Sequence, residues 1–372
     1  MFRIKMLPAR YGDSLWIEYG RPSNPRRVLI DGGLASTYAV LRAHLLGLLS
    51  SQRHFDLIAV THIDADHIEG MITLLADRDL SFTTDDFWFN AWRHFSPAPK
   101  SLLGPLHGEY LSAMIDARGF NWNRSFGDFA TRAAYAHPPV VIQDDCLPVV
   151  TLDGGMKLTL LAPDLTALGK LKRVWKREVQ KAGLEAGDLP AWQARLYDTP
   201  RLLPKSLLGD GAPTLEALAS KASKQDNSVA NGSSLAFLAE YEGKTCLFAG
   251  DAPPDKLSAG IRRLLASRPG QDRLALDAFK VAHHGGSKNF TPELAALLDC
   301  PRYLFSTNGE RYGHPDKETI ARLLTAGRAP CQLLFNYCSD ANQTWVDPQL
   351  KSRYHYDTSY PADNSHGLTI DL

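Results

Sequence analysis

The stretch Thr61-His62-Ile63-Asp64-Ala65-Asp66-His67-Ile68-Glu69-Gly70 decides the fold, and it follows the apolar run Phe55-Asp56-Leu57-Ile58-Ala59-Val60. The apolar run is rich in bulky and β-branched residues, which predicts a buried strand. Two histidines and two aspartates then stand within six residues, His62 to His67. Because Asp is rare in strands and seldom buried without a partner, this composition at a strand's end implies a bound cation. A solvated polar turn is the alternative, but it gives no reason for His and Asp to alternate.

The motif resembles the metal-binding signature of the metallo-β-lactamase superfamily, in the H-x-D-x-D-H form found in ComEC-type DNA-uptake proteins and their soluble relatives. Five further stretches agree with the family and follow its order along the chain. They are Leu29–Gly33, Asn231–Leu235, Leu247–Asp251, Lys280–Gly286, and Ser306–Gly309 with the following Gly313–Pro315. The resemblance implies an α/β fold, the αβ/βα four-layer sandwich, with the metal site at the shared edge of its two sheets.

Local patterns predict several elements of such a fold. Alternation of apolar and polar residues predicts a β-hairpin or meander over residues 1–33 and hairpins over residues 151–163 and 231–251. Apolar residues at helical spacing predict helices over residues 37–50, 68–75 and 255–266.

We expect one domain of this fold over residues 1–372, carrying two insertions. The first, at about 80–150, is rich in aromatic residues and also contains His94, His107 and His137. We interpret its rings as ordinary core, with a substrate-facing stacking surface as the alternative, and none of its histidines as a ligand. The second insertion, at about 165–224, is charged and helical. Its basic cluster between Leu168 and Ala182 is interpreted as a solvated helix face, with contact to phosphate backbones as the alternative.

Composition limits the partners and the compartment. The chain has 41 basic and 41 acidic residues, so no global field attracts DNA or an anionic membrane. The five cysteines are odd in number and contain no C-x-x-C pair, which indicates reduced thiols. Met1–Met6 alternates like a strand rather than forming a signal peptide, and no apolar run approaches the length of a membrane span. We therefore expect a cytoplasmic protein without a membrane span, unlike the membrane-embedded ComEC proteins.

The resemblance also assigns the metal ligands by position. It implies that His62 and Asp64 bind a first ion, that Asp66 and His67 bind a second, and that Asp251 bridges the two. Asp31, at the end of an early strand, is expected to support the metal loop from behind, with an ordinary turn as the alternative.

His283 is our choice for the distal ligand of the second ion. His284 and His314 are placed at the rim of the pocket as catalytic donors, and Asp66 is also given a catalytic role, orienting the nucleophile and taking its proton. The alternative that His284 or His314 is the ligand stays open, because both rings of the adjacent pair could turn toward the site.

Two departures from the family pattern bear on the metal. Asp64 stands where many relatives have a second His, and Asn231-Gly232-Ser233-Ser234 contains no His where many relatives have a further one. Oxygen ligands in place of imidazole make the first site harder and weaker for zinc. We expect one or two zinc ions. Three alternatives stay open for the first site: it prefers manganese, it fills only when substrate binds, or it stays empty.

These features predict a metal-dependent hydrolase that uses a metal-bound hydroxide, on a phosphodiester of a nucleic acid or nucleotide. The first alternative is a lactone, thioester or amide hydrolase with the same site, and the second is a non-catalytic binding or regulatory protein. A cationic rim would favour the phosphodiester and an apolar rim the carbonyl substrate. The sequence leaves protein partners unknown.

Overall fold

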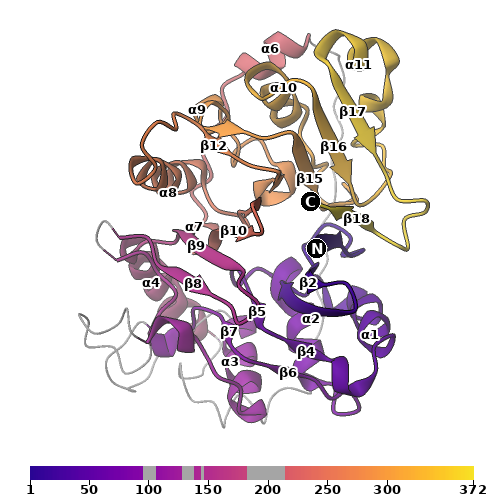
Figure 1. Ribbon diagram of the computed structural model, residues 1–372. Coiled ribbons are helices and arrows are strands. Elements are labelled where there is room, and N and C mark those ends of the chain that lie inside the picture. Colours follow the sequence, from indigo (N-terminus) through magenta and orange to yellow (C-terminus); the bar gives the residue numbers. More distant parts are fainter. Residues whose placement is uncertain (95–105, 128–137, 144–145, 182–213) are drawn as a thin grey trace.

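The computed structural model describes residues 1–94, 106–127, 138–143, 146–181 and 214–372. Its first sheet has six strands in the order β18-β1-β2-β3-β5-β7 (Figure 1). The strands are β1 (Phe2–Met6), β2 (Leu15–Arg21), β3 (Asn24–Ile30), β5 (Leu57–Ala59), β7 (Phe87–Trp88) and β18 (Leu368–Asp371). β1, β2 and β3 form the antiparallel meander expected over residues 1–33, and β5 and β7 continue the sheet in parallel.

The second sheet has eight strands in the order β17-β16-β15-β13-β11-β10-β9-β8. They are β8 (Val149–Thr151), β9 (Lys157–Ala162), β10 (Ala236–Tyr241), β11 (Lys244–Phe248), β13 (Ala278–Lys280), β15 (Arg302–Phe305), β16 (Cys331–Phe335) and β17 (Tyr356–Ser359). The β8–β9 and β10–β11 hairpins confirm the hairpins predicted from the alternating patterns. From β11 to β17 all neighbours are parallel. Two short pairs lie outside these sheets: β4 (His54–Phe55) with β6 (Thr83–Thr84), and β12 (Leu274–Ala275) with β14 (Leu298–Asp299).

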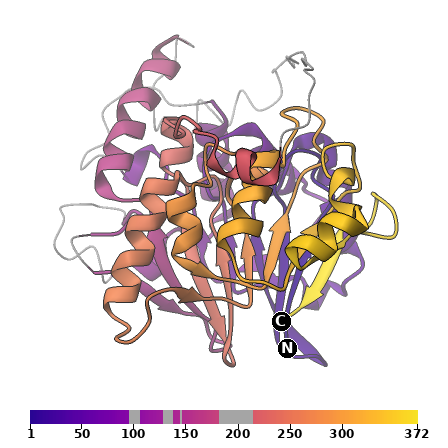
Figure 2. The ribbon, with the colours of Figure 1, turned by 90° about the horizontal axis from the view of Figure 1, so that it is seen from above.

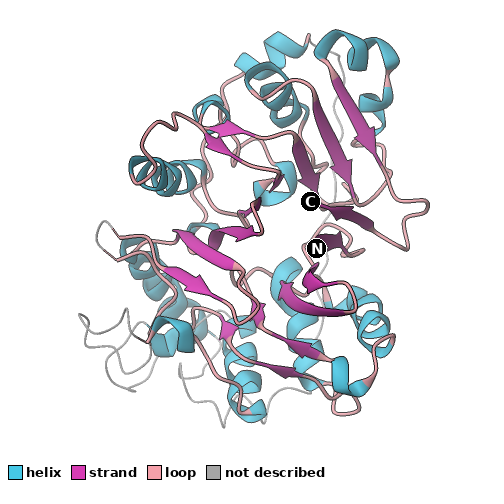
Figure 3. Cartoon of the chain, viewed as in Figure 1, coloured by secondary structure: helices cyan, strands magenta, loops and turns pink. Residues whose placement is uncertain are grey.

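Helices cover the outer face of each sheet (Figures 2 and 3). Those packed on the first sheet are α1 (Tyr38–Leu46), α2 (Ala65–Ala76), α3 (Leu106–Arg118) and α4 (Leu165–Lys181). Those packed on the second are α6 (Leu215–Ser220), α8 (Pro254–Ala266), α9 (Pro292–Ala296), α10 (Lys317–Ala326) and α11 (Pro348–Tyr354). One apolar cluster contains residues of both sheets, so it fills the space between them. The four layers confirm the predicted αβ/βα sandwich.

The alternation of side chains explains why the central strands are apolar on both faces. In β5, Leu57 and Ala59 face the core between the sheets, whereas Ile58 faces the helices α1, α2 and α3. A strand buried on both faces has no polar positions, and a continuous apolar run results. The chain therefore meets its first polar residues where β5 ends, at the metal motif.

Local differences from the sequence predictions matter for the site. The helix expected from Ile68 begins already at Ala65, so Asp66 and His67 lie on the first turn of α2. The C-terminal strand β18 pairs with β1, which brings the two termini together (Figures 1 and 2).

The aromatic residues of the first predicted insertion are largely buried. Phe87, Trp88, Phe89 and Phe126 are each at most 1% exposed, which supports the core interpretation. Phe95, Phe129 and His137 lie outside the described residues, as do residues 182–213 of the charged insertion. Lys170, Arg173 and Lys176 are exposed on α4, as a solvated face requires. Within the described parts, no helix combines the length and the apolar character needed to cross a membrane.

Candidate metal centre

The predicted ligands meet at one edge of the sandwich, beyond the C-terminal ends of four strands. His62 follows β5, Asp251 follows β11, His283 and His284 follow β13, and His314 lies in the loop after β15. Strands that run in the same direction end at the same edge, which is why residues distant in sequence converge here.

Asp251 stands between two groups of imidazoles. Its Oδ1 lies 3.4 Å from His67 Nε2 and 3.8 Å from His284 Nε2. Its Oδ2 lies 3.6 Å from both His62 Nε2 and His283 Nε2. The carboxylate is buried, so one side chain presents an oxygen to each of two neighbouring positions.

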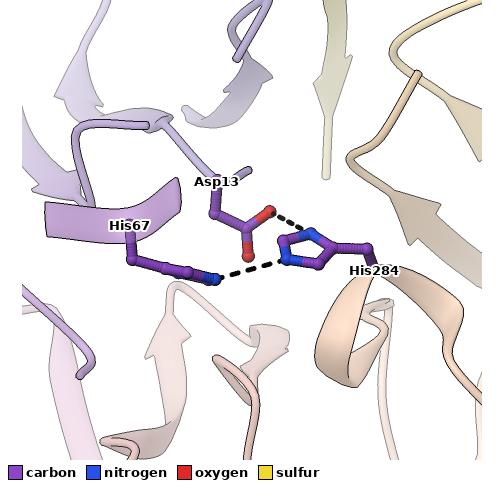
Figure 4. A group of neighbouring side chains, drawn as sticks. All are labelled: Asp13, His67 and His284. Carbon is purple, nitrogen blue, oxygen red and sulfur yellow. Dashed lines mark hydrogen bonds and ion pairs between the residues drawn. The ribbon is translucent and has the colours of Figure 1, made fainter. Parts of the chain in front are cut away.

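The structure places His284 rather than His283 beside Asp66 and His67. His284 Nε2 is 3.3 Å from His67 Nε2 (Figure 4). The same nitrogen is 3.6 Å from Asp66 Oδ2. His283 lies instead on the His62 side of Asp251. From the sequence, His283 was expected at the second ion and His284 at the rim, whereas in the structure His284 lies beside Asp66 and His67. Which of the two binds the ion stays a prediction.

The backbone explains how both adjacent rings reach the site. His283, His284 and Gly285 are consecutive residues with positive φ values of 50°, 56° and 92°. Left-handed backbone costs a non-glycine residue about 1–2 kcal/mol, so two such residues in succession must be held by their surroundings. This tight turn directs both imidazoles toward Asp251, which sequence alone could not show.

His62, Asp64 and His314 occupy the more open side. His62 Nε2 is buried and lies 3.5 Å from Asp64 Oδ2, whereas the Asp64 side chain is 44% exposed. The His314 ring lies 5.4 Å from the His283 ring, and its Nδ1 is 2.7 Å from Asp316 Oδ1. The predicted placement of His314 at the rim agrees with this position.

Asp31 supports the metal loop as expected. Its carboxylate accepts hydrogen bonds from the Thr61 amide at 2.7 Å, from the Thr61 hydroxyl at 2.8 Å and from His67 Nδ1 at 2.8 Å. Two glycines allow the backbones to approach. The Gly32 amide donates to the His67 carbonyl, and the Gly70 amide donates to the Gly33 carbonyl, both at 2.8 Å. A Cβ on Gly70 would lie 1.9 Å from the Gly32 oxygen, so a side chain there is excluded.

Two residues that the sequence analysis did not select also belong to the centre. Asp13 lies against His284, with Oδ1 3.4 Å from His284 Nδ1 (Figure 4), and its Oδ2 accepts from Lys280 Nζ at 2.7 Å. Both side chains are 1% exposed. A lysine inside the apolar strand β13 was the available signal, because a buried lysine requires a partner.

The segment Asn231–Ser234, which contains no His, supports the site through hydrogen bonds. Asn231 donates to Asp226 at 2.6 Å, and Asp226 also accepts from the Asn289 amide at 2.9 Å. Asn289 in turn accepts from His283 Nδ1 at 2.8 Å. Asn231 therefore belongs to a polar network that holds His283. Ser234 accepts from the Asp251 amide at 3.3 Å, so this segment also supports Asp251.

The hydrogen bonds orient the imidazoles. His284 Nδ1 lies 2.9 Å from the Ser306 carbonyl, His67 Nδ1 faces the Asp31 carboxylate, and His283 Nδ1 faces the Asn289 oxygen. Each of these groups accepts, so each Nδ1 donates and each Nε2 is the nitrogen left for the site. His62 Nδ1 faces the Thr61 hydroxyl at 3.0 Å, which already donates to Asp31 and so accepts from His62. All four Nε2 atoms thus face the space around Asp251, where a metal ion can replace a proton on them.

Charges in this space require a cation. Burial lowers the pKa of His67, but the Asp251 and Asp31 carboxylates outweigh burial and raise that pKa well above its ordinary value. Burial likewise raises the pKa of Asp251, but His67 and its neighbours hold it well below its ordinary range. The carboxylates therefore demand positive charge at the imidazoles, and a metal ion can supply it in place of protons.

Two groups of three side chains are spaced to hold a metal ion here: His62, His67 and Asp251, and Asp13, His67 and His284. His62 Nε2 and Asp251 Oδ1 are buried and have no hydrogen-bond partner, as expected of atoms that bind a metal ion. Nitrogen and carboxylate ligands suit zinc and also manganese.

A third group of this kind, His54, Asp56 and Asp85, lies elsewhere. There Asp56 Oδ2 accepts from Tyr19 and from Arg26, so the Arg26 guanidinium already supplies a positive charge to the carboxylate. Asp56 Oδ1 is buried without a hydrogen-bond partner, 3.7 Å from His54 Nε2.

No family model and no curated protein matches the chain. Among solved structures, the chain is similar to the short form of human tRNase Z, with 10% identity, a TM-score of 0.38, and coverage of 100% of this chain and 99% of that one.

It is also similar to Zn²⁺-bound PqqB from Methylobacterium extorquens, with 14% identity, a TM-score of 0.33 and coverage of 96% and 87%. A metallo-β-lactamase from Cronobacter sakazakii gives 15% identity, a TM-score of 0.29 and coverage of 77% and 78%. The fold assignment follows from the layers and the strand order, not from these likenesses.

Proposed function

We propose that the chain is a metal-dependent hydrolase that cleaves a phosphodiester. The observation that carries the proposal is the approach of His67 Nε2 and His284 Nε2 to 3.3 Å, each with its Nδ1 proton engaged elsewhere. Two ring nitrogens this close in a buried site need a positive charge between them, a proton or a metal ion, and a metal ion can take the place of the proton. Asp66 and Asp251 provide oxygens beside the same point.

The donors divide into two sets around Asp251. We assign Asp66, His67 and His284 to one ion, and His62, Asp64 and His283 to the other, with one Asp251 oxygen directed to each set. When bound, the ions polarise the scissile bond and lower the pKa of a coordinated water toward neutrality. Zinc fits both sets, and manganese is the alternative for the set that contains the exposed Asp64.

The protein's own groups then position the reactants. Asp66 offers a carboxylate oxygen that orients the attacking water and accepts its proton. Asp316 holds His314 Nδ1 and is itself held by the Ser287 amide at 2.8 Å. Burial raises the pKa of Asp316, but the hydrogen bond and charge of His314, together with the Ser287 hydrogen bonds, outweigh burial and lower that pKa to about 2. An ionised Asp316 fixes the His314 ring and favours its imidazolium form, in which both ring nitrogens donate, so that Nε2 can pass a proton to the leaving oxygen.

The choice of a phosphodiester over a carbonyl substrate rests on the rim. Arg311 lies three residues before His314, and no carboxylate of the described residues lies within the 4.0 Å of an ion pair. A cation without a counter-ion beside a hydrolytic site favours an anionic substrate. The motif resemblance to ComEC-type proteins supports the same class by analogy.

The test combines metal analysis with turnover. We would measure zinc and manganese in protein purified without added metal, and hydrolysis of bis(p-nitrophenyl) phosphate, for the wild type and for Asp251→Asn. We expect about one to two ions per chain in the wild type, markedly less in the variant, and turnover lowered by more than about a hundredfold.

His54→Ala is the matched control, because it removes a histidine from the group around Asp56, where Arg26 already supplies the positive charge, and it should change neither quantity. Equal metal content in wild type and Asp251→Asn, with both proteins folded by circular dichroism, would overturn the site. Metal without phosphodiester turnover, together with turnover of a p-nitrophenyl ester or a lactone, would overturn the substrate class.

A further inference from the structure

Two loops lie next to each other beside the metal centre. The Asn308 amide donates to the Arg10 carbonyl at 2.8 Å, and Arg10 Nε donates to Glu310 at 3.0 Å. The Arg10 amide also donates to the Tyr337 hydroxyl at 2.8 Å. These contacts fix the segment around residues 10–12 against the segment 308–314, so side chains from both are held in one place.

Arg311 is surrounded by aromatic rings from both loops. Its guanidinium carbon lies 5.1 Å from the ring centre of Tyr11 and 5.0 Å from that of Tyr312, and Nη1 donates to the Tyr11 hydroxyl at 3.1 Å. Its Nε is buried without a hydrogen-bond partner. The rings restrict the guanidinium without neutralising it, so it keeps strong donors for a ligand.

This cluster, which we name the Arg311 clamp (Tyr11, Arg311 and Tyr312), borders the metal centre. The Tyr312 ring lies 5.8 Å from the His314 ring, and Tyr11 is two residues from Asp13, whose amide donates to the Asp66 carbonyl at 3.1 Å. The pKa of Tyr312 is raised, chiefly by burial, and the charges of Asp66 and Asp64 contribute to the shift. Tyr312 is nevertheless 51% exposed, so part of its surface is open to a ligand.

We propose that the Arg311 clamp is the substrate-recognition site, in which Arg311 binds a phosphate and the exposed Tyr312 ring stacks on the adjoining base. The substrate is therefore a nucleotide or a single-stranded nucleic acid. This inference rests on the proposed hydrolase function and narrows its substrate. Guanidinium groups bind phosphates through paired donors, and aromatic side chains stack on bases of any sequence. A neutral lactone or amide would use neither feature.

The test is equilibrium binding of adenosine 5′-monophosphate and of adenosine, by calorimetry, to protein whose metal content is measured on the same samples. Arg311→Gln should weaken binding of the monophosphate by roughly tenfold to a hundredfold, as expected for loss of a charged hydrogen bond. The ratio of the adenosine and monophosphate dissociation constants should fall toward one. Tyr312→Ala should weaken both ligands by roughly tenfold.

Arg353→Gln is the matched control. Arg353 also lies over a tyrosine, with its guanidinium carbon 5.3 Å from the Tyr354 ring centre, but it is exposed on α11. The Arg353→Gln variant should bind adenosine and its monophosphate with the affinities of the wild type. Equal monophosphate affinity in Arg311→Gln and Arg353→Gln would overturn the clamp, as would a wild type that does not bind the monophosphate. Failure of the proposed hydrolase appears separately, as equal metal content in wild type and Asp251→Asn.

Discussion

Removal of the Lys280 ammonium should destabilise the protein strongly, because it leaves the Asp13 carboxylate buried without its partner. In the structure Lys280 Nζ lies 2.7 Å from Asp13 Oδ2, and each side chain is 1% exposed. Lys280→Met keeps most of the side chain's volume in strand β13 and removes only the charge and the hydrogen bonds. Burial raises the pKa of Asp13, but Lys280 and His284 hold it below its ordinary range, so the carboxylate is charged in the folded protein.

The magnitude follows from the geometry. At 2.7 Å and an effective dielectric constant of about 20, the attraction between the two charges is about 6 kcal/mol. Desolvation of both ions offsets most of this attraction in the intact pair, so the pair itself adds little net stability. Loss of one partner removes the attraction and retains the desolvation of the other, which typically costs about 3–5 kcal/mol.

Urea unfolding followed by tryptophan fluorescence measures this cost, with Lys256→Met as the control. Lys256 lies at the same distance, 2.7 Å, from Asp164 Oδ2, but the two side chains are 24% and 32% exposed. Loss of the Lys256 ammonium should lower the free energy of unfolding by about 1 kcal/mol or less. The double variant Asp13→Asn/Lys280→Met should be more stable than Lys280→Met alone. Equal destabilisation by Lys280→Met and Lys256→Met would refute the argument, because burial is the main difference between the two pairs.

Two further outcomes follow from contacts outside the ligand set. Gly70→Ala should lower the free energy of unfolding by about 2 kcal/mol or more, since the added Cβ would meet the Gly32 backbone. The control is Gly169→Ala in helix α4, where an added Cβ meets no atom within 4 Å. This variant should raise the free energy of unfolding by up to about 1 kcal/mol. Burial raises the pKa of Asp164, but the hydrogen bond and charge of Lys256, together with the Ala167 amide, outweigh burial and lower that pKa. Asp164 therefore stabilises the fold above its unfolded pKa of about 4, and this stabilisation is lost as the pH falls through the folded pKa. Asp164→Asn should therefore lower the urea midpoint at pH 7 and by less at pH 3, and an equal loss at both would contradict the assignment.

Several strands and helices could be predicted because they follow local patterns. Period-two alternation predicted β1, β2 and both hairpins, and the apolar run at Leu57–Ala59 predicted a buried strand. The position of β18 beside β1 could not be predicted, because that pairing joins residues at opposite ends of the chain and leaves no local signal.

The sequence selected residue types and neighbourhoods for the site but not rotamers. The His62–His67 motif was selected because a cluster of ligands at a strand's end needs a cation, and Asp251 was selected by its position in the family resemblance. The positions of His283 and His284 on opposite sides of Asp251 were hidden, since they depend on two consecutive left-handed residues that the sequence does not favour. Asp13 was missed because its meaning comes from Lys280, which follows it by 267 residues.

The charges at the centre connect the number of ions to the class of substrate. Lys280 neutralises Asp13, which leaves the four carboxylates of Asp31, Asp64, Asp66 and Asp251 around neutral imidazoles. One divalent ion would leave two negative charges beside the substrate, and an anionic phosphodiester would be repelled. A second ion would cancel them, so that Arg311 would supply the net positive charge that the phosphate meets. On this argument the weaker ion set, which contains the exposed Asp64, governs whether an anion can enter. Phosphodiester binding should therefore depend on occupancy of that set more steeply than binding of a neutral nucleoside does.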